Sequence, residues 1–127
     1  MAISFNKNSV FNLKPINREL VLGEVQGLLI PGEDVWYAFQ TIRDQIVFTN
    51  KRIISIDVQG ITGRKKSFTT MPYSKIQYFS VQTPGFMEFF PDSELFLTFS
   101  SGFTAKFEFK GQVDIGAIGR LISEFVL

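Results

Sequence analysis

Five carboxylates are the side chains whose type and spacing could support acid–base chemistry: Asp44, Asp57, Glu88, Asp92 and Glu94. Two carboxylates can act as general acid and general base when their surroundings separate their pKa values. The chain contains no cysteine and no histidine, which excludes thiolate nucleophiles, imidazole bases and the usual zinc sites. Because isolated acids at strand ends are usually solvated or paired with Lys and Arg, we expect no catalytic residue, metal site or cofactor, and no enzymatic activity.

The densest positive charge in the sequence comes from two short runs of Lys and Arg: Lys51, Arg52, Arg64, Lys65 and Lys66. Near an anionic leaflet each such charge contributes about 1 kcal/mol to binding, so the five charges together could support weak association with a membrane surface. The other interpretation, which we favour, is a solvated hairpin connection.

An apolar stretch bracketed by prolines lies between two predicted strands, from Pro84 to Pro91. Its large apolar side chains are Phe86, Met87, Phe89 and Phe90, and its single charge is Glu88. Connections normally lie at the surface, where a contiguous apolar patch indicates a partner. Aromatic residues and methionine are enriched at protein interfaces. Two interpretations stay open: the stretch forms an interface, or it folds back over an open end of the barrel.

Trp36 and Tyr37, near the start of the first predicted strand, are further candidates for partner binding. Each can expose an apolar face and a polar tip. Most of the 15 phenylalanines have a simpler explanation as core residues, since each can bury on the order of 150–250 Å². The phenylalanines that we expect in the core are Phe39, Phe48, Phe79, Phe99, Phe107 and Phe109.

The whole chain has the composition of one globular domain. It has 127 residues, 45% of them hydrophobic, and a net charge of +1. No stretch reaches the roughly 20 apolar residues of a membrane span, and the N-terminus lacks the continuous apolar core of a secretory signal. We therefore expect a cytoplasmic protein. The absence of a large basic excess argues against nucleic acid as its partner.

The middle of the chain has the pattern of strands, and both ends have the pattern of helices. Short runs rich in Val, Ile, Phe, Tyr and Thr predict seven strands, at 35–43, 45–49, 52–59, 67–71, 75–82, 94–100 and 104–109. A two-residue turn through Asn50 and Lys51 should use the tolerance of asparagine for positive φ. Apolar spacing near 3.6 predicts helices at 17–29 and 113–127, the latter with Ile118, Leu121, Ile122 and Phe125 on one face.

The run from Arg43 to Lys65 reads RDQIVFTNKRIISIDVQGITGRK. It resembles the signature of the bacterial pleckstrin-homology-like domains, in which RD, FTNKR, QG and TGKK follow one another around short apolar runs. The segments 71–76, 79–83 and 94–95 also resemble that family, so the similarity extends from about Asn17 to the C-terminus. Residues 1–16 do not match the family pattern, and the stretch from Pro84 to Pro91 is longer and more apolar than the usual acidic turn.

The resemblance implies a mainly β, PH-like barrel or roll. Its seven antiparallel strands would lie in two near-orthogonal sheets capped by the C-terminal helix, with an extra N-terminal helix. Residues 17–127 would form this single domain, and residues 1–16 an N-terminal segment for which no structure is predicted. The family further implies self-association into a ring-like homo-oligomer and no enzymatic activity. Uncovered strand edges add a physical reason to expect binding of a protein or peptide. An anionic membrane surface is the alternative that we favour less.

Overall fold

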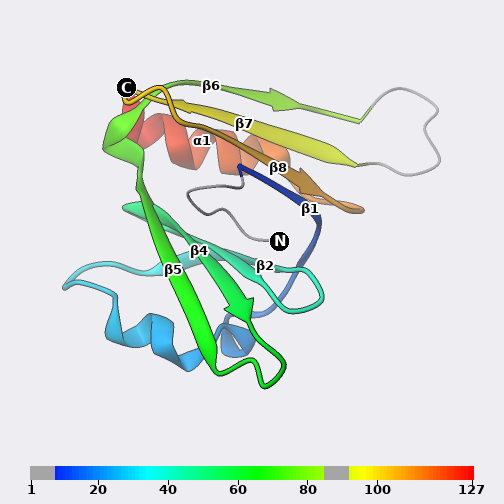
Figure 1. Ribbon diagram of the computed structural model, residues 1–127. Helices are drawn as coiled ribbons and strands as arrows, with labels where there is room; N and C mark the ends of the chain where they lie inside the picture. Colours follow the sequence, from blue (N-terminus) through cyan, green and yellow to red (C-terminus); the bar gives the residue numbers. More distant parts are fainter. Residues whose placement is uncertain (1–7, 85–91) are drawn as a thin grey trace.

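The computed structural model describes residues 8–84 and 92–127, and within them a bent β-sheet packs against one long helix (Figure 1). The strands are β1 (Ser9–Pro15), β2 (Val35–Gln40), β3 (Gln45–Thr49), β4 (Arg52–Gln59), β5 (Lys65–Pro72), β6 (Ile76–Gln82), β7 (Ser93–Phe99) and β8 (Thr104–Phe109). The helix is α1 (Ile115–Val126), and three short 3-10 helices are η1 (Arg18–Leu20), η2 (Gly23–Gly27) and η3 (Tyr73–Lys75). All seven predicted strands and the C-terminal helix are confirmed, with ends that shift by up to three residues.

The strands form a single sheet in the order β5-β4-β3-β2-β1-β8-β7-β6, so the expected pair of separate sheets is wrong. The difference arises from β1, a strand that the sequence pattern did not predict. The first part of β1 pairs in parallel with β8, and Lys14 and Pro15 pair antiparallel with β2. Within the pairing with β8 the register shifts between Val10 and Leu13, where Asn12 adopts a φ of 61°. Asparagine is one of the few residues that tolerate this conformation, so Asn12 lets one strand join the two halves of the sheet.

The predicted N-terminal helix at 17–29 is also wrong, because this segment forms only η1 and η2. Gln45 of β3 takes the place of helical hydrogen bonds: its Nε2 donates to the Leu20 carbonyl and its Oε1 accepts from the Leu22 N–H, both at 2.9 Å. Gly23 and Gly27 further weaken a helix here. The segment covers the outer face of β2–β4, where Val25 lies in a second buried cluster.

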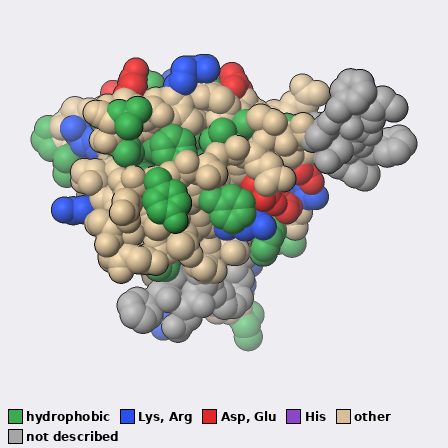
Figure 2. All heavy atoms as spheres, turned by 90° about the horizontal axis from the view of Figure 1, so that it is seen from above, with side chains coloured by type: hydrophobic (Ala, Val, Ile, Leu, Met, Phe, Trp, Pro, Cys, Tyr) green, Lys and Arg blue, Asp and Glu red, His purple; other side chains and the backbone are tan. Residues whose placement is uncertain are grey.

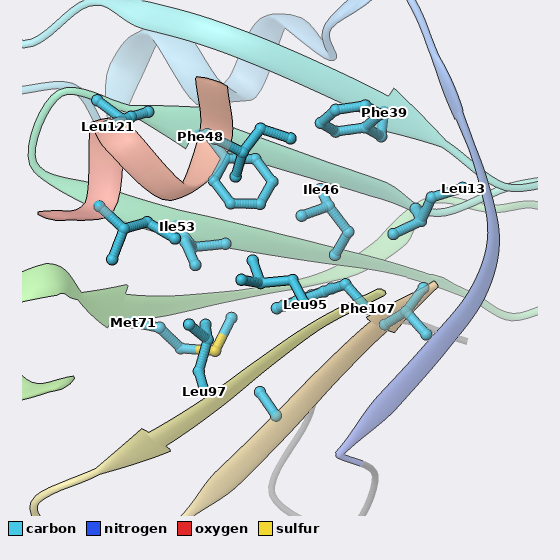
Figure 3. Packing of buried hydrophobic residues seen from close by; sticks show 14 of the residues in the cluster. Leu13, Phe39, Ile46, Phe48, Ile53, Met71, Leu95, Leu97, Phe107 and Leu121 are labelled. Carbon is cyan, nitrogen blue, oxygen red and sulfur yellow. The ribbon is translucent and has the colours of Figure 1, made fainter. Parts of the chain in front are cut away.

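The main core lies between the two halves of the bent sheet and α1 (Figure 3). In Figure 3, Phe39, Phe48 and Ile53 lie opposite Leu95 and Phe107. Five of the six expected core phenylalanines are buried, and Phe79 packs against the same cluster while partly exposed. The helix contributes the expected face: Ile118, Leu121 and Ile122 are buried, and Phe125 stacks on Tyr73 with ring centroids 5.7 Å apart.

The two-residue turn between β3 and β4 is confirmed, but its predicted conformation is wrong. Among the described non-glycine residues only Asn12 has a positive φ, so Asn50 does not use one. The hydroxyl of Thr49 closes the turn instead, by accepting hydrogen bonds from the Lys51 and Arg52 N–H groups at 3.0 Å. The Asn50 side chain reaches outward, where it accepts from the Asp34 N–H and donates to the Gly32 carbonyl.

Candidate interaction surfaces

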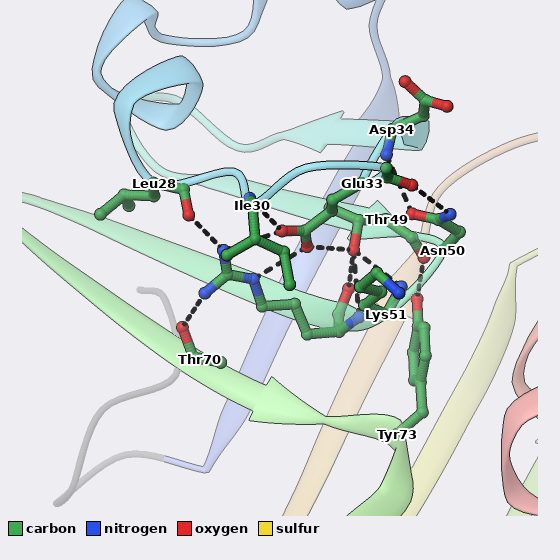
Figure 4. Close-up of polar contacts among 11 residues, drawn as sticks. Leu28, Ile30, Glu33, Asp34, Thr49, Asn50, Lys51, Thr70 and Tyr73 are labelled. Atoms are coloured by element: carbon green, nitrogen blue, oxygen red, sulfur yellow. Dashed lines mark hydrogen bonds and ion pairs between the residues drawn. The ribbon is translucent and has the colours of Figure 1, made fainter.

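A buried ion pair lies where the loop before β2 meets the turn between β3 and β4 (Figure 4). Arg52 Nε donates to Glu33 Oε2 at 2.9 Å, and Arg52 Nη2 donates to Glu33 Oε1 at 3.0 Å. Glu33 also accepts from the Thr49 hydroxyl and from the Ile30 N–H. The Glu33 side chain is 1% exposed, so its charge depends on these donors.

Burial alone would raise the pKa of Glu33, but hydrogen bonds from Arg52, Thr49 and Ile30 outweigh burial and hold that pKa below its usual value. Nearby, the Tyr73 hydroxyl donates to the Thr49 carbonyl at 2.7 Å. Burial, and secondarily the Glu33 charge, raises the pKa of Tyr73. The FTNKR run therefore contributes Phe48 to the core and Thr49, Asn50 and Arg52 to a structural network. The sequence pattern gave no signal for Glu33 as their partner.

The structure does not bring the five predicted basic residues together. Arg52 pairs with Pro72 in the β4–β5 register and Gln59 pairs with Lys65, so the two basic runs lie at opposite ends of this hairpin. Seven residues of strand separate these ends by about 23 Å. Arg52 is held by Glu33, and Lys66 forms an ion pair with Glu24 at 2.7 Å. The remaining three, Lys51, Arg64 and Lys65, are exposed.

Trp36 and Tyr37 line two adjoining hollows beside β2. Trp36 is 49% exposed and Tyr37 is half-buried. The pairing of β1 with β2 stops at Pro15 and Phe39, so within the described residues no strand pairs with this side of β2 at Trp36. Arg18 lines both hollows and donates from Nη1 to the Val35 carbonyl at 3.2 Å. Both predicted residues therefore lie on an accessible surface.

A band of exposed aromatic side chains crosses the outer face of β6, β7, β8 and β1, and the sequence pattern did not single it out. It consists of Tyr78, Phe96 and Phe11, with Lys106 between the two phenylalanines. The Lys106 Nζ lies 5.2 Å from the Phe96 ring centroid and 5.7 Å from that of Phe11. Figure 2 shows this side of the molecule, where hydrophobic rings are exposed at the surface with acidic and basic side chains beside them. We call these four residues the aromatic band.

A further hollow, of about 590 Å³, lies between β5 and the turn from β7 to β8. Its lining is mainly apolar and includes the buried Met71 and Phe99 and the half-buried Phe103. The one charged residue in the lining is Lys75, which forms no ion pair with any carboxylate of the described residues. We call this feature the Lys75 hollow.

The carboxylates considered for acid–base chemistry are held in separate structural contacts. Asp44 accepts from the Val58 N–H, Asp57 accepts from Gln59, and Glu94 and Asp92 form ion pairs with Lys106 and Lys110. Within residues 8–84 and 92–127, no group of three or more Asp, Glu, Cys or His is placed to hold a metal ion. Glu88 and the predicted interface residues Phe86, Met87, Phe89 and Phe90 lie outside the described residues.

No helix in the described part of the chain is long and apolar enough to cross a membrane.

The model of the bacterial PH domain family matches residues 4–126 of the chain. Two proteins of Bacillus subtilis are similar in sequence. The uncharacterized protein YozO is 31% identical over 109 residues, which cover 86% of this chain and 92% of YozO. The uncharacterized protein YjqA is 46% identical over 84 residues, which span 66% of each protein.

Three crystal structures are similar in fold. A DUF1696 family protein with a pleckstrin-homology domain from Shewanella loihica has a TM-score of 0.72 and 34% identity, covering 93% of this chain and 100% of that one. A pleckstrin homology domain from Shewanella amazonensis has a TM-score of 0.63 and 34% identity, covering 88% and 90%. A PH domain-containing protein from Exiguobacterium sibiricum has a TM-score of 0.62 and 16% identity, and the match covers 90% of this chain and 60% of that protein. This similarity shows a shared fold alone.

Proposed function

Because the chain belongs to the family of bacterial PH domains, we propose that it is a non-enzymatic interaction module that self-associates into a ring-like homo-oligomer and binds protein or peptide partners. The observation that carries the partner-binding part of this proposal is the open edge of β6 beside the aromatic band. Within the described residues, β6 has a strand neighbour on one side only. Tyr78 lies on this edge strand and Phe96 on the strand next to it.

An extended partner strand could add to β6 by backbone hydrogen bonds while its side chains contact the band. Tyr78 is opposite Thr98 in the register and Phe96 is opposite Ser80, which places the two rings diagonally on one face. Tyr78 is 61% exposed and Phe96 is 40% exposed, so both rings are open to a partner. In many interfaces a few residues supply most of the binding energy, and tyrosine is enriched among them.

Binding to an anionic membrane has less support. That alternative depends on five basic residues acting together, but they are divided between the two ends of the β4–β5 hairpin, and Arg52 and Lys66 are held by Glu33 and Glu24. Sedimentation with anionic vesicles at low and high salt tests it directly, since electrostatic attachment weakens as salt rises.

Selection from a displayed library of random peptides tests the partner surface. We expect enriched peptides to bind the wild type in extended form and to lose at least tenfold in affinity against a Tyr78→Ser/Phe96→Ser variant. Ile61→Ser is the matched control, because Ile61 is fully exposed and lies outside the band. Peptides that bind the double variant as tightly as the wild type would contradict the proposed surface.

A further inference from the structure

The Lys75 hollow is an apolar site with one cation and no occupant from the described part of its own chain. Met71 and Phe99 are 4% and 5% exposed, which shows that the hollow reaches the main core. The Lys75 ammonium has no carboxylate partner among the described residues. The side chains that would complement this site are therefore large and apolar, with one acid among them.

The chain itself contains a segment of that composition. Residues 86–90 read Phe-Met-Glu-Phe-Phe, with four large apolar side chains around a single acid, Glu88. This segment joins β6 to β7 and follows Pro84, the last described residue before it. Its apolar side chains match the lining of the hollow, and Glu88 matches the charge of Lys75.

The segment cannot reach the hollow of its own copy. Ile76 pairs with Phe99 beside the hollow, whereas Gln82 pairs with Glu94 at the other end of the β6–β7 hairpin. The six residue steps from Ile76 to Gln82 span about 20 Å of strand. A connection from Pro84 to Asp92, held at both ends, reaches about 14 Å at most. This segment could therefore fill only the hollow of another molecule.

We infer that residues 86–90 of one copy occupy the Lys75 hollow of the next copy, with Glu88 beside Lys75. The contact is head-to-tail, because each copy offers its 86–90 segment at one end of the β6–β7 hairpin and its hollow at the other. Such contacts form rings when the rotation between copies closes. This inference rests on the proposed self-association and names the two surfaces that carry it.

Charge reversal tests the contact, with the mass of each variant followed by light scattering over a dilution series. Lys75→Glu and Glu88→Lys should each raise the dissociation constant of the assembly at least tenfold, since each places like charges together in the hollow. The double variant Lys75→Glu/Glu88→Lys should return within threefold of the wild type. Lys14→Glu, an exposed residue outside both surfaces, is the matched charge control and should leave the assembly unchanged.

The outcomes separate this contact from the proposed function. A wild type that assembles while both single variants assemble equally well overturns the contact and leaves self-association in place. The contact is also overturned if both single variants assemble more weakly than the wild type and the double variant does not assemble better than they do. A monomeric wild type overturns both proposals. Replacing Phe86, Phe89 and Phe90 by Ser should dissociate the assembly as well, and unchanged melting temperatures must show that each variant still folds.

Discussion

Arg52 and Glu33 form a two-point ion pair in which each Glu33 carboxylate oxygen accepts from the Arg52 guanidinium, at 2.9 and 3.0 Å. The pair joins the loop before β2 to the first residue of β4. Arg52 also donates to the Leu28 carbonyl and to the Thr70 hydroxyl, so one guanidinium connects three separate segments of the chain. The contribution of Arg52 to the molecule is therefore structural.

Replacing Arg52 by Leu should destabilise the fold by about 3 kcal/mol, because the Glu33 carboxylate would stay buried without its cation. Arg52→Lys should have a smaller effect, since lysine keeps the charge but not the two-point geometry. Urea unfolding measures both. The matched control is Arg64→Leu, which removes an exposed arginine and should change stability by less than about 0.5 kcal/mol. A loss of similar size in both Leu variants would contradict the structural assignment.

Acid should destabilise the protein partly through Glu33. Its folded pKa lies below the usual 4.5, so its contribution is fully present above about pH 4.5 and is lost as the pH falls through the folded pKa. Unfolding free energies measured from pH 7 down to pH 3 should fall less steeply for Glu33→Gln than for the wild type. Parallel pH profiles would show that Glu33 does not supply this dependence.

Raising the pH should destabilise the protein through Tyr73, whereas lowering the pH does so through Glu33. Because the folded pKa of Tyr73 lies above its usual 10.0, the folded state is unaffected below pH 10 and loses stability as the pH rises beyond it. Tyr73→Phe removes the ionisable group but also the hydrogen bond to the Thr49 carbonyl. The variant should therefore be less stable near pH 7 yet lose less stability above pH 10. Equal alkaline losses in both proteins would contradict this view of Tyr73.

Local patterns predicted the central strands well because their side-chain periodicity matches their burial. In β8, for example, Ala105, Phe107 and Phe109 are buried and alternate with more exposed residues, as the alternation indicated. The same reasoning failed for residues 17–29, because the deciding contact is the side chain of Gln45, which lies far away in the sequence. It missed β1 because that strand shifts register between Val10 and Leu13 and changes partners after Leu13, and so has no single period.

The candidate surfaces were predicted less completely for a related reason. Trp36 was identified from its type alone and is exposed. The aromatic band and the Lys75 hollow each combine residues from several elements, so only the register between strands reveals them. The basic residues looked like one group in the sequence, but the length of the β4–β5 hairpin separates them.

Asn12 provides a test of how β1 joins the two halves of the sheet. Its φ of 61° is unfavourable for residues with a branched β-carbon, so Asn12→Val should destabilise the fold by about 1–2 kcal/mol. Asn12→Gly should be close to neutral, because glycine adopts positive φ freely. Thermal unfolding measures both variants, and Lys14→Val is the control on the same strand. A Val variant at position 12 as stable as the Gly variant would contradict the role of this conformation.

The mass of the wild-type protein in solution, followed by light scattering as it is diluted through micromolar concentrations, tests the account most directly. One chain has a mass of 14.4 kDa. A self-associating module should give a defined multiple of this value that falls toward 14.4 kDa only on strong dilution. A mass of 14.4 kDa at every concentration would contradict the proposal that this domain acts by assembling with copies of itself.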